Sequence, residues 1–171
     1  MATATITPDK NAVIAEIFIA APPARVFQAI SDPSQTSKWW GQSGLYRVTQ
    51  SKADVRVGGT WRSDGVGADG TMFYVEGEYL EVDPPKTLAH TWIGSYSGPM
   101  KTIVRWTLEP QEVHGLHPSG PKKSGTGTLV RVTQEGFAGN HELAGSHGEG
   151  WKRVLGWLMV YIEQAITIDA R

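Results

Sequence analysis

APPARVFQAISDPSQTSKWWG (residues 21–41) and HGEGWKRVLGWLMVYIEQ (residues 147–164) are the two stretches that decide the fold of this chain. Both have the spacing of apolar side chains that is typical of helices, whereas most of the sequence between them has the alternation and turn residues of strands. One strand, two short helices, a run of strands and one long helix therefore follow one another. This order predicts an α+β domain in which a sheet curls around the final helix, with a pocket between them.

The first stretch contains two helix starts. Pro22 and Pro23 suit the first turn of one helix, because proline is tolerated where no backbone donor is needed. Asp32, followed by Pro33, has the pattern of an N-cap that opens a second helix. We expect this second helix to end at residues 39–41, where two tryptophans precede a glycine.

Seven strands are expected from β-rich segments that Gly, Pro or Asp residues bound. They cover residues 13–19 before the helices, and residues 45–50, 55–63, 71–82, 87–93, 101–109 and 126–135 after them. The segment Pro110 to Gly125 is polar and rich in Gly and Pro, and we expect it to form a mobile hairpin extension.

The second stretch predicts a long terminal helix. Ser146 and Glu149 have the spacing of a capping box, so we expect the main helix to start there, with a turn or a preceding helical piece around Asn140 to Gly145. Its apolar residues cover an arc of about 160°, which is wider than a surface helix needs. Trp157 and Val160 fall outside this arc, which indicates that a loop or a second copy covers them. We accordingly expect a monomer or a homodimer.

Length and composition favour a single domain spanning residues 1–171, with a sizeable core. The absence of cysteine excludes disulfides, thiol nucleophiles and cysteine zinc sites. The 16 Lys and Arg residues are scattered among 17 Asp and Glu residues, which argues against nucleic acid as a partner. Neither a signal peptide nor an apolar stretch of about 20 residues is present, so we expect a cytoplasmic protein without a membrane partner.

Five segments give the chain a resemblance to a known family. They are residues 21–41, VGGTWR (57–62), GEYLEVDPPKTLAHTW (77–92), GTLVRVTQEGF (127–137) and EGWKRVLGWL (149–158). In this order they resemble the START-like, or Bet v 1-like (SRPBCC), helix-grip superfamily, and within it the group named after the activator of Hsp90 ATPase. The resemblance implies a seven-stranded antiparallel sheet that grips the last helix, with two short helices closing one end of a cavity.

The resemblance also implies several functions, because members include lipid carriers, hormone-binding proteins, polyketide cyclases and stress-linked proteins. A chaperone is an alternative partner that the name of the group implies. Gln134 stands where relatives commonly have a histidine, so a proton-transfer role of that histidine does not carry over to this chain.

Two patterns invite a catalytic interpretation. Residues 65–70 match G-x-G-x-x-G, but a dinucleotide site requires a helix after this motif, and here another strand follows. Strand alternation places Glu76 and Glu78 on the same face as Leu80, unless Gly77 marks a bulge. If that face is concave, these carboxylates meet His90 in the pocket and could act with it as general acid and base. Otherwise both glutamates face solvent.

Seven tryptophans are the stronger signal, because indoles offer broad apolar faces to a flat or hydrophobic ligand. Packing of the core is the alternative explanation. The predicted ligand-binding residues are Trp39, Trp40, Trp61, Leu80, His90, Trp92, Val104, Trp106, Val132, Gln134, Trp151, Leu155 and Leu158. No pair among His114, His117, His141 and His147 has the i, i+4 spacing of a helical metal site, so we expect neither a metal nor a cofactor.

The leading hypothesis is therefore a protein that binds a small hydrophobic or aromatic molecule between the sheet and the terminal helix. An enzyme of the cyclase or hydratase type, using His90 with Glu76 or Glu78, is one alternative. A role as a partner of a chaperone in stress responses is another.

Overall fold

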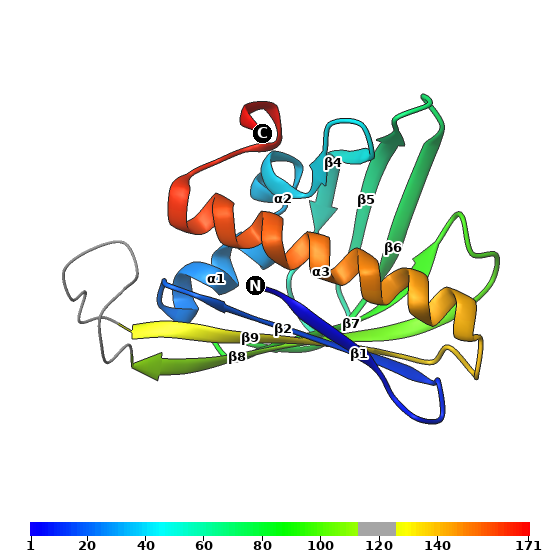
Figure 1. The fold of residues 1–171 in the computed structure, drawn as a ribbon, viewed down its shortest axis with the longest axis horizontal. Helices are drawn as coiled ribbons and strands as arrows, with labels where there is room; N and C mark the ends of the chain where they lie inside the picture. Colours follow the sequence, from blue (N-terminus) through cyan, green and yellow to red (C-terminus); the bar gives the residue numbers. More distant parts are fainter. Residues whose placement is uncertain (113–125) are drawn as a thin grey trace.

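The computed structural model describes residues 1–112 and 126–171, and its main element is one antiparallel sheet (Figure 1). The strands are β1 (Thr3–Ile6), β2 (Ala12–Ile19), β3 (Gly41–Gln42), β4 (Tyr46–Ala53), β5 (Thr60–Gly67), β6 (Met72–Asp83), β7 (Thr87–Gly94), β8 (Lys101–Glu112) and β9 (Thr126–Glu135). Their order is β1-β2-β9-β8-β7-β6-β5-β4-β3. The α+β class is confirmed, but the predicted count of seven strands is wrong, because the described residues form nine.

Two short helices follow β2, as the sequence predicts. They are α1 (Pro23–Ser31) and α2 (Pro33–Trp39). Asp32 caps α2, since its carboxylate accepts a hydrogen bond from the backbone N–H of Ser34 at 2.9 Å and another from the Ser34 hydroxyl at 2.7 Å. The cap therefore fixes the point at which α2 starts, and α2 carries two tryptophans toward the centre of the molecule.

The long helix α3 (His141–Gln164) lies across one face of the sheet (Figure 1). It starts before the predicted capping box at Ser146, so the predicted start is wrong, and the segment expected as a turn or a separate helical piece around Asn140 to Gly145 forms the beginning of the same helix. Asn140 is the actual N-cap, and its side chain accepts a hydrogen bond from the backbone N–H of Leu143 at 3.1 Å. The fully buried Ala144 anchors this first turn, a tertiary contact that the capping pattern does not contain.

The strands differ from prediction at several boundaries. Strand β1 and the two-residue strand β3 were not predicted. Strand β5 starts at Thr60 rather than Val55, because residues 54–59 form a turn in which Gly58 has a φ of 83°. The G-x-G-x-x-G match at residues 65–70 falls on the end of β5 and the hairpin turn to β6, and no helix follows it. Strand β8 continues to Glu112, and the rest of the predicted extension, residues 113–125, lies outside the described residues.

Apolar side chains fill the space between α3 and the sheet. They include Val13, Ala15, Ile17, Val104, Trp106, Val130, Val132, Trp151, Val154, Leu155 and Leu158. Trp157, which lies outside the main apolar arc of α3, is covered by the chain itself. Its indole N–H donates to Gln42 Oε1 at 3.1 Å, and the Arg171 guanidinium lies 5.6 Å from its ring centroid. Trp157 therefore gives no support to a homodimer. No helix in residues 1–112 or 126–171 is long and apolar enough to cross a bilayer.

Replacing Asp32 by alanine tests the cap of α2. We expect Asp32→Ala to lower the free energy of unfolding by about 1 kcal/mol, because the two hydrogen bonds at the helix start are lost. Asp32→Asn, which keeps an acceptor at this position, should retain most of the stability. Urea unfolding measures both variants, and equal destabilisation by alanine and asparagine would contradict the capping role.

The same carboxyl group makes the cap dependent on pH. The hydrogen bond from the Ser34 hydroxyl, more than any other contact, holds the pKa of Asp32 below its ordinary value of 3.8. A lowered pKa in the folded state contributes stability that is present at neutral pH and is lost as the pH falls through the acid range. Asp32→Asn should lack this part of the acid sensitivity.

Candidate functional site

A cavity of about 340 Å³ lies between α3 and the neighbouring strands β4 to β7, and it is partly open to solvent. Its volume is in the range of small-molecule sites. The lining residues are Trp40, Tyr46, Val48, Trp61, Ser63, Phe73, Val75, Trp92, Tyr96, Ser146, His147, Gly150, Trp151, Arg153 and Val154. Aromatic and aliphatic side chains dominate this list, so the cavity offers mainly apolar surface.

Three indoles that touch one another form the inner wall of the cavity. The ring centroid of Trp40 lies 6.1 Å from that of Trp92 and 5.8 Å from that of Trp151, and the last two are 6.1 Å apart. Trp61 extends this wall, with its centroid 5.5 Å from that of Trp92. The rings come from the residue that follows α2 and from β5, β7 and α3, so the wall exists only when these elements are assembled.

Local structure explains how the lining side chains converge. Along β5 the alternation of a strand turns Trp61 and Ser63 to the same face. On α3, His147, Trp151 and Val154 follow one another at spacings of four and three residues, which places them on one side of the helix. The cavity thus lies between an inward strand face and one stripe of α3.

A second, smaller pocket of about 50 Å³ lies on the other side of this wall, toward α1 and α2. His90 and Tyr79 line it, whereas Trp40, Trp61 and Trp92 line both pockets. Trp40, Trp61 and Trp92 therefore separate the larger cavity from the smaller pocket.

The structure brings only some of the predicted ligand-binding residues to the larger cavity. Trp40, Trp61, Trp92 and Trp151 line it, while His90 and Trp106 line the smaller pocket. The remaining inward residues belong to the buried core and reach neither pocket. They are Trp39, Val104, Val132, Gln134, Leu155 and Leu158. The prediction that His90 and Trp92 share a face of their strand is consistent with this arrangement.

Glu76, Glu78 and Leu80 share one face of β6 as predicted, but that face points outward, which is the alternative in which both glutamates face solvent. Leu80 therefore does not line a pocket, and its assignment as a ligand-binding residue is wrong. Tyr79 points inward and is only 5% exposed, so its neighbours Glu78 and Leu80 point outward, and Leu80 is 44% exposed. Glu76 also faces away from the cavity, where it forms an ion pair with Arg62 at 3.5 Å. The irregularity in this strand pair lies between Tyr79 and Glu81 instead of at residue 77. No carboxylate of β6 therefore lines either the larger cavity or the smaller pocket.

His90 is a neutral imidazole with a defined tautomer. Its Nδ1 lies 3.0 Å from the carbonyl oxygen of Thr91, which can only accept, so Nδ1 carries the proton. Burial lowers the pKa of His90 to about 4. The Trp61 ring packs edge-on against the imidazole at 4.8 Å between centroids. Nε2 of His90 is therefore unprotonated, and the residue lines the smaller pocket.

Gln134 determines the tautomer of a second histidine, His147. The Trp151 indole N–H donates to Gln134 Oε1 at 2.9 Å, which identifies this atom as the amide oxygen. His147 Nδ1 lies 2.9 Å from the same oxygen and must therefore donate to it. The amide nitrogen of Gln134 donates in turn to the Thr102 hydroxyl at 2.9 Å. Thr102, Gln134, Trp151 and His147 form one connected network.

This network leaves Nε2 of His147 available to the cavity. Burial lowers the pKa of His147 to about 4, so the imidazole is neutral at neutral pH and Nε2 holds a free lone pair. This atom has no hydrogen-bond partner within residues 1–112 and 126–171, and it is not among the buried unpaired atoms. His147 can therefore accept a hydrogen bond from a molecule in the cavity, and at neutral pH it does not retain a proton.

Sequence reasoning missed most of the lining residues. They are Tyr46, Val48, Ser63, Phe73, Val75, Tyr96, Ser146, His147, Gly150, Arg153 and Val154. Helical spacing from Trp151 would have pointed to His147 and Val154, and strand alternation from Trp61 would have pointed to Ser63. Tyr96 lies in a loop, where no periodicity applies. Within the described residues, no group of three His, Asp or Glu side chains is close enough together to hold a metal ion. His114 and His117 lie outside the described residues.

Comparisons with known proteins add a family and a set of related folds. The family model described as activator of Hsp90 ATPase homolog 1-like protein matches residues 20–115. A solved structure from Chromobacterium violaceum is 24% identical, with 90% of this chain and 98% of that chain covered and a TM-score of 0.65. One from Rhodobacter sphaeroides is 17% identical, with 95% and 97% covered and a TM-score of 0.73.

A third similar structure is DynU16, a protein of the dynemicin biosynthetic locus. It is 22% identical, with 91% of this chain and 48% of that chain covered and a TM-score of 0.67. These likenesses show a shared fold. A comparison with curated proteins gives no match.

The two neutral histidines predict a stability that declines in mild acid. In the unfolded chain both imidazoles take up protons below their ordinary pKa of 6.5, whereas in the folded protein they do so only near pH 4. The unfolded state therefore binds more protons between these values, and the free energy of unfolding should fall from pH 6.5 to about pH 4. Urea unfolding at a series of pH values measures this decline.

Histidine variants test whether His90 and His147 cause this decline in stability. The double variant His90→Phe/His147→Phe should flatten the decline, because neither imidazole remains to titrate. His141→Gln, which removes an exposed histidine at the start of α3, should leave the profile unchanged. An unaltered decline in the double variant would show that other groups cause it.

Proposed function

The chain belongs to the family of activator of Hsp90 ATPase homolog 1-like proteins, and we propose that the cavity between α3 and strands β4 to β7 binds a small hydrophobic or aromatic molecule. The observation that carries this proposal is the cavity itself. It is large enough for a small molecule, it is lined mainly by apolar side chains, and it remains accessible from solvent.

The energy of binding would come mainly from apolar burial. Removing roughly 200 Å² of apolar ligand surface from water contributes about 5 kcal/mol before the entropy cost of association. The flat faces of Trp40, Trp92 and Trp151 favour a ligand that is itself flat, because aromatic rings gain from offset and edge-on contacts. The cavity wall therefore favours an aromatic ligand over a branched aliphatic one.

Gly150 supports a role in binding over a role in packing alone. It lines the cavity, and a Cβ added at this position would meet no heavy atom within 4 Å. A larger side chain would fit here and would fill part of the space. The chain instead has a glycine on the face of α3 that borders the cavity.

The likeness to DynU16 adds a biosynthetic intermediate to the ligand classes worth testing. A lipid ligand, a role in stress responses, a cytoplasmic location and a chaperone partner stay predictions that derive from the family resemblance.

An enzyme that moves protons is a second candidate function. The original pairing of His90 with Glu76 or Glu78 is not available, because both carboxylates lie on the outer face. His147 provides a different base, since its Nε2 is unprotonated and borders the larger cavity. Such a base can take a proton from carbon next to a carbonyl group, and the imidazolium so formed, whose pKa is about 4, returns the proton to the enolate oxygen to give the enol.

A pair of glycine variants tests the binding proposal. Gly150→Leu should weaken binding of the neutral fluorescent probe N-phenyl-1-naphthylamine by about 10-fold or more, because the new side chain occupies the space that the probe requires. Titration followed by probe fluorescence gives the affinity. Urea unfolding of the same variant should show equal or greater stability, since leucine favours helix over glycine.

Gly156→Leu is the matched control. Gly156 lies on the same helix, has open space at its Cβ and does not line the cavity. Its leucine variant should gain similar stability and bind the probe like the wild-type protein. The absence of probe binding to the wild type, or equal binding by both variants, would argue against the proposed site.

Benzoylacetone, an aromatic diketone, tests the second candidate. The wild-type protein should accelerate its enolisation, measured by ultraviolet absorbance, and His147→Gln should reduce the acceleration by about 100-fold. His90→Gln should retain it, because His90 lines only the smaller pocket. If the wild-type protein does not accelerate the enolisation, or if His147→Gln and His90→Gln give equal rates, proton transfer at His147 is excluded for this substrate class.

A further inference from the structure

We propose that the ligand of the larger cavity carries one anionic group, such as a carboxylate, and that Arg153 binds this group together with the hydroxyls of Tyr46 and Tyr96. This inference rests on the proposed function and adds the charge and orientation of the ligand. The apolar part of such a molecule would lie against the tryptophan wall, with its charged end near solvent.

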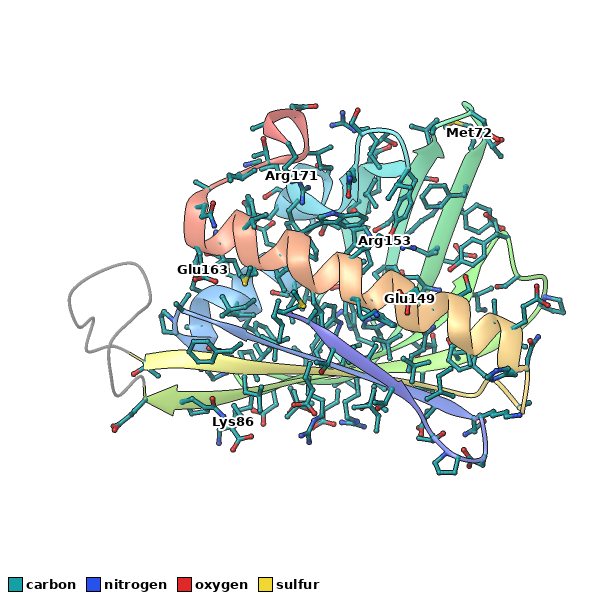
Figure 2. All side chains as sticks on the ribbon, in the orientation of Figure 1. Met72, Lys86, Glu149, Arg153, Glu163 and Arg171 are labelled. Atoms are coloured by element: carbon teal, nitrogen blue, oxygen red, sulfur yellow. The ribbon has the colours of Figure 1, made fainter. Side chains whose placement is uncertain are left out.

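Arg153 is the single charged side chain among the residues that line the cavity, and no carboxylate lines it. It extends from the middle of α3 on the side of strands β5 and β6 (Figure 2). Within the described residues it has no hydrogen-bond, ion-pair or ring partner. The adjacent Lys152, in contrast, does not line the cavity and pairs with Glu149 at 3.0 Å. The cavity therefore contains an unpaired cation beside an apolar wall.

Two tyrosine hydroxyls provide donors at the same cavity. The Trp92 indole N–H donates to the Tyr96 hydroxyl oxygen at 3.1 Å, so the hydroxyl hydrogen of Tyr96 remains free to donate. Tyr46, Tyr96 and Arg153 all line this cavity, so their polar ends border the same space. A ligand oxygen that accepts hydrogen bonds matches this set of donors.

The protonation states agree with an anionic ligand. Burial raises the pKa of Tyr46, so its phenol stays protonated and neutral at neutral pH. Burial likewise raises the pKa of Tyr96, and His147 is neutral at neutral pH as well. Arg153 alone therefore sets the charge of the cavity, and that charge is positive. A cationic ligand would be repelled, and a carboxylate would form charge-assisted hydrogen bonds.

A matched pair of probes tests the inference. The flat aromatic acid 2-naphthoate carries a carboxylate, and its methyl ester has the same rings without the charge. We expect Arg153→Gln to weaken binding of 2-naphthoate by about 5-fold to 10-fold, a range that allows for partial exposure of the arginine. Binding of the ester should change less than about 2-fold, because it relies on apolar contacts. Isothermal titration calorimetry measures both affinities.

Lys152→Gln is the charge-matched control. It removes the same unit of charge from the next residue of α3, outside the cavity, and should leave both affinities near those of the wild type. Arg153→Lys should restore part of the loss for the acid, because it returns the charge without the planar donor geometry. The affinity of the wild type for 2-naphthoate should also fall with added salt, and that of Arg153→Gln should fall less.

Each contrary outcome has a distinct meaning. If the ester and the acid both bind, and Arg153→Gln weakens neither, the anionic group is disproved while the binding site stands. If Lys152→Gln weakens the acid as much as Arg153→Gln does, a general effect of helix charge replaces direct contact, and the inference fails. If neither probe binds the wild-type protein, the proposed function and the inference fail together.

Discussion

The amide oxygen of Gln134 is the interaction on which the candidate site depends. It accepts one hydrogen bond from Trp151 and one from His147, and so attaches two residues of α3 to strand β9. Gln134 is fully buried, and an unpaired donor at this depth would cost about 1–3 kcal/mol. The same contact orients an indole of the cavity wall and leaves one histidine nitrogen free. The Gln134 amide oxygen therefore both holds α3 against the sheet and determines the tautomer of His147.

The partition formed by Trp40, Trp61 and Trp92 gives the two pockets different characters. The smaller space borders His90 and the two short helices, and the larger one borders α3 and solvent. Trp40 reaches both pockets because the cap at Asp32 fixes the helix that precedes it. The volume available to a ligand thus depends on ring orientations as well as on the backbone. Rotation of one indole would change the size of both pockets together.

Local signals explain which parts of this architecture could be predicted from the sequence. The start of α2 depends on Asp32, whose cap is formed within three residues, and the predicted helix is confirmed. Asn140 is likewise a local cap, but the capping-box spacing at Ser146 points to a later start of α3. Burial of Ala144 in the core, which no local pattern contains, accompanies the earlier start. The inward face of β6 depends on an irregularity near Tyr79, and a shift of one residue reverses every side chain.

The candidate site was less predictable than the fold for the same reason. Indoles that the sequence singles out do form the wall, because large aromatic side chains are buried wherever they can be. The polar residues of the cavity depend on which neighbours are already paired. Arg153 and Lys152 are both cations in one helical turn, and only the three-dimensional structure shows that Glu149 pairs with one of them. The sequence alone does not distinguish the two.

The composition of α3 has a consequence for how the molecule assembles. Its 24 residues include glycine at positions 145, 148, 150 and 156, and each glycine costs about 1 kcal/mol of helix stability relative to alanine. Such a segment forms little helix on its own and gains its order by docking onto the sheet. Folding of α3 and creation of the cavity are therefore one cooperative event, and a bound molecule that bridges helix and strands would slow the opening of both.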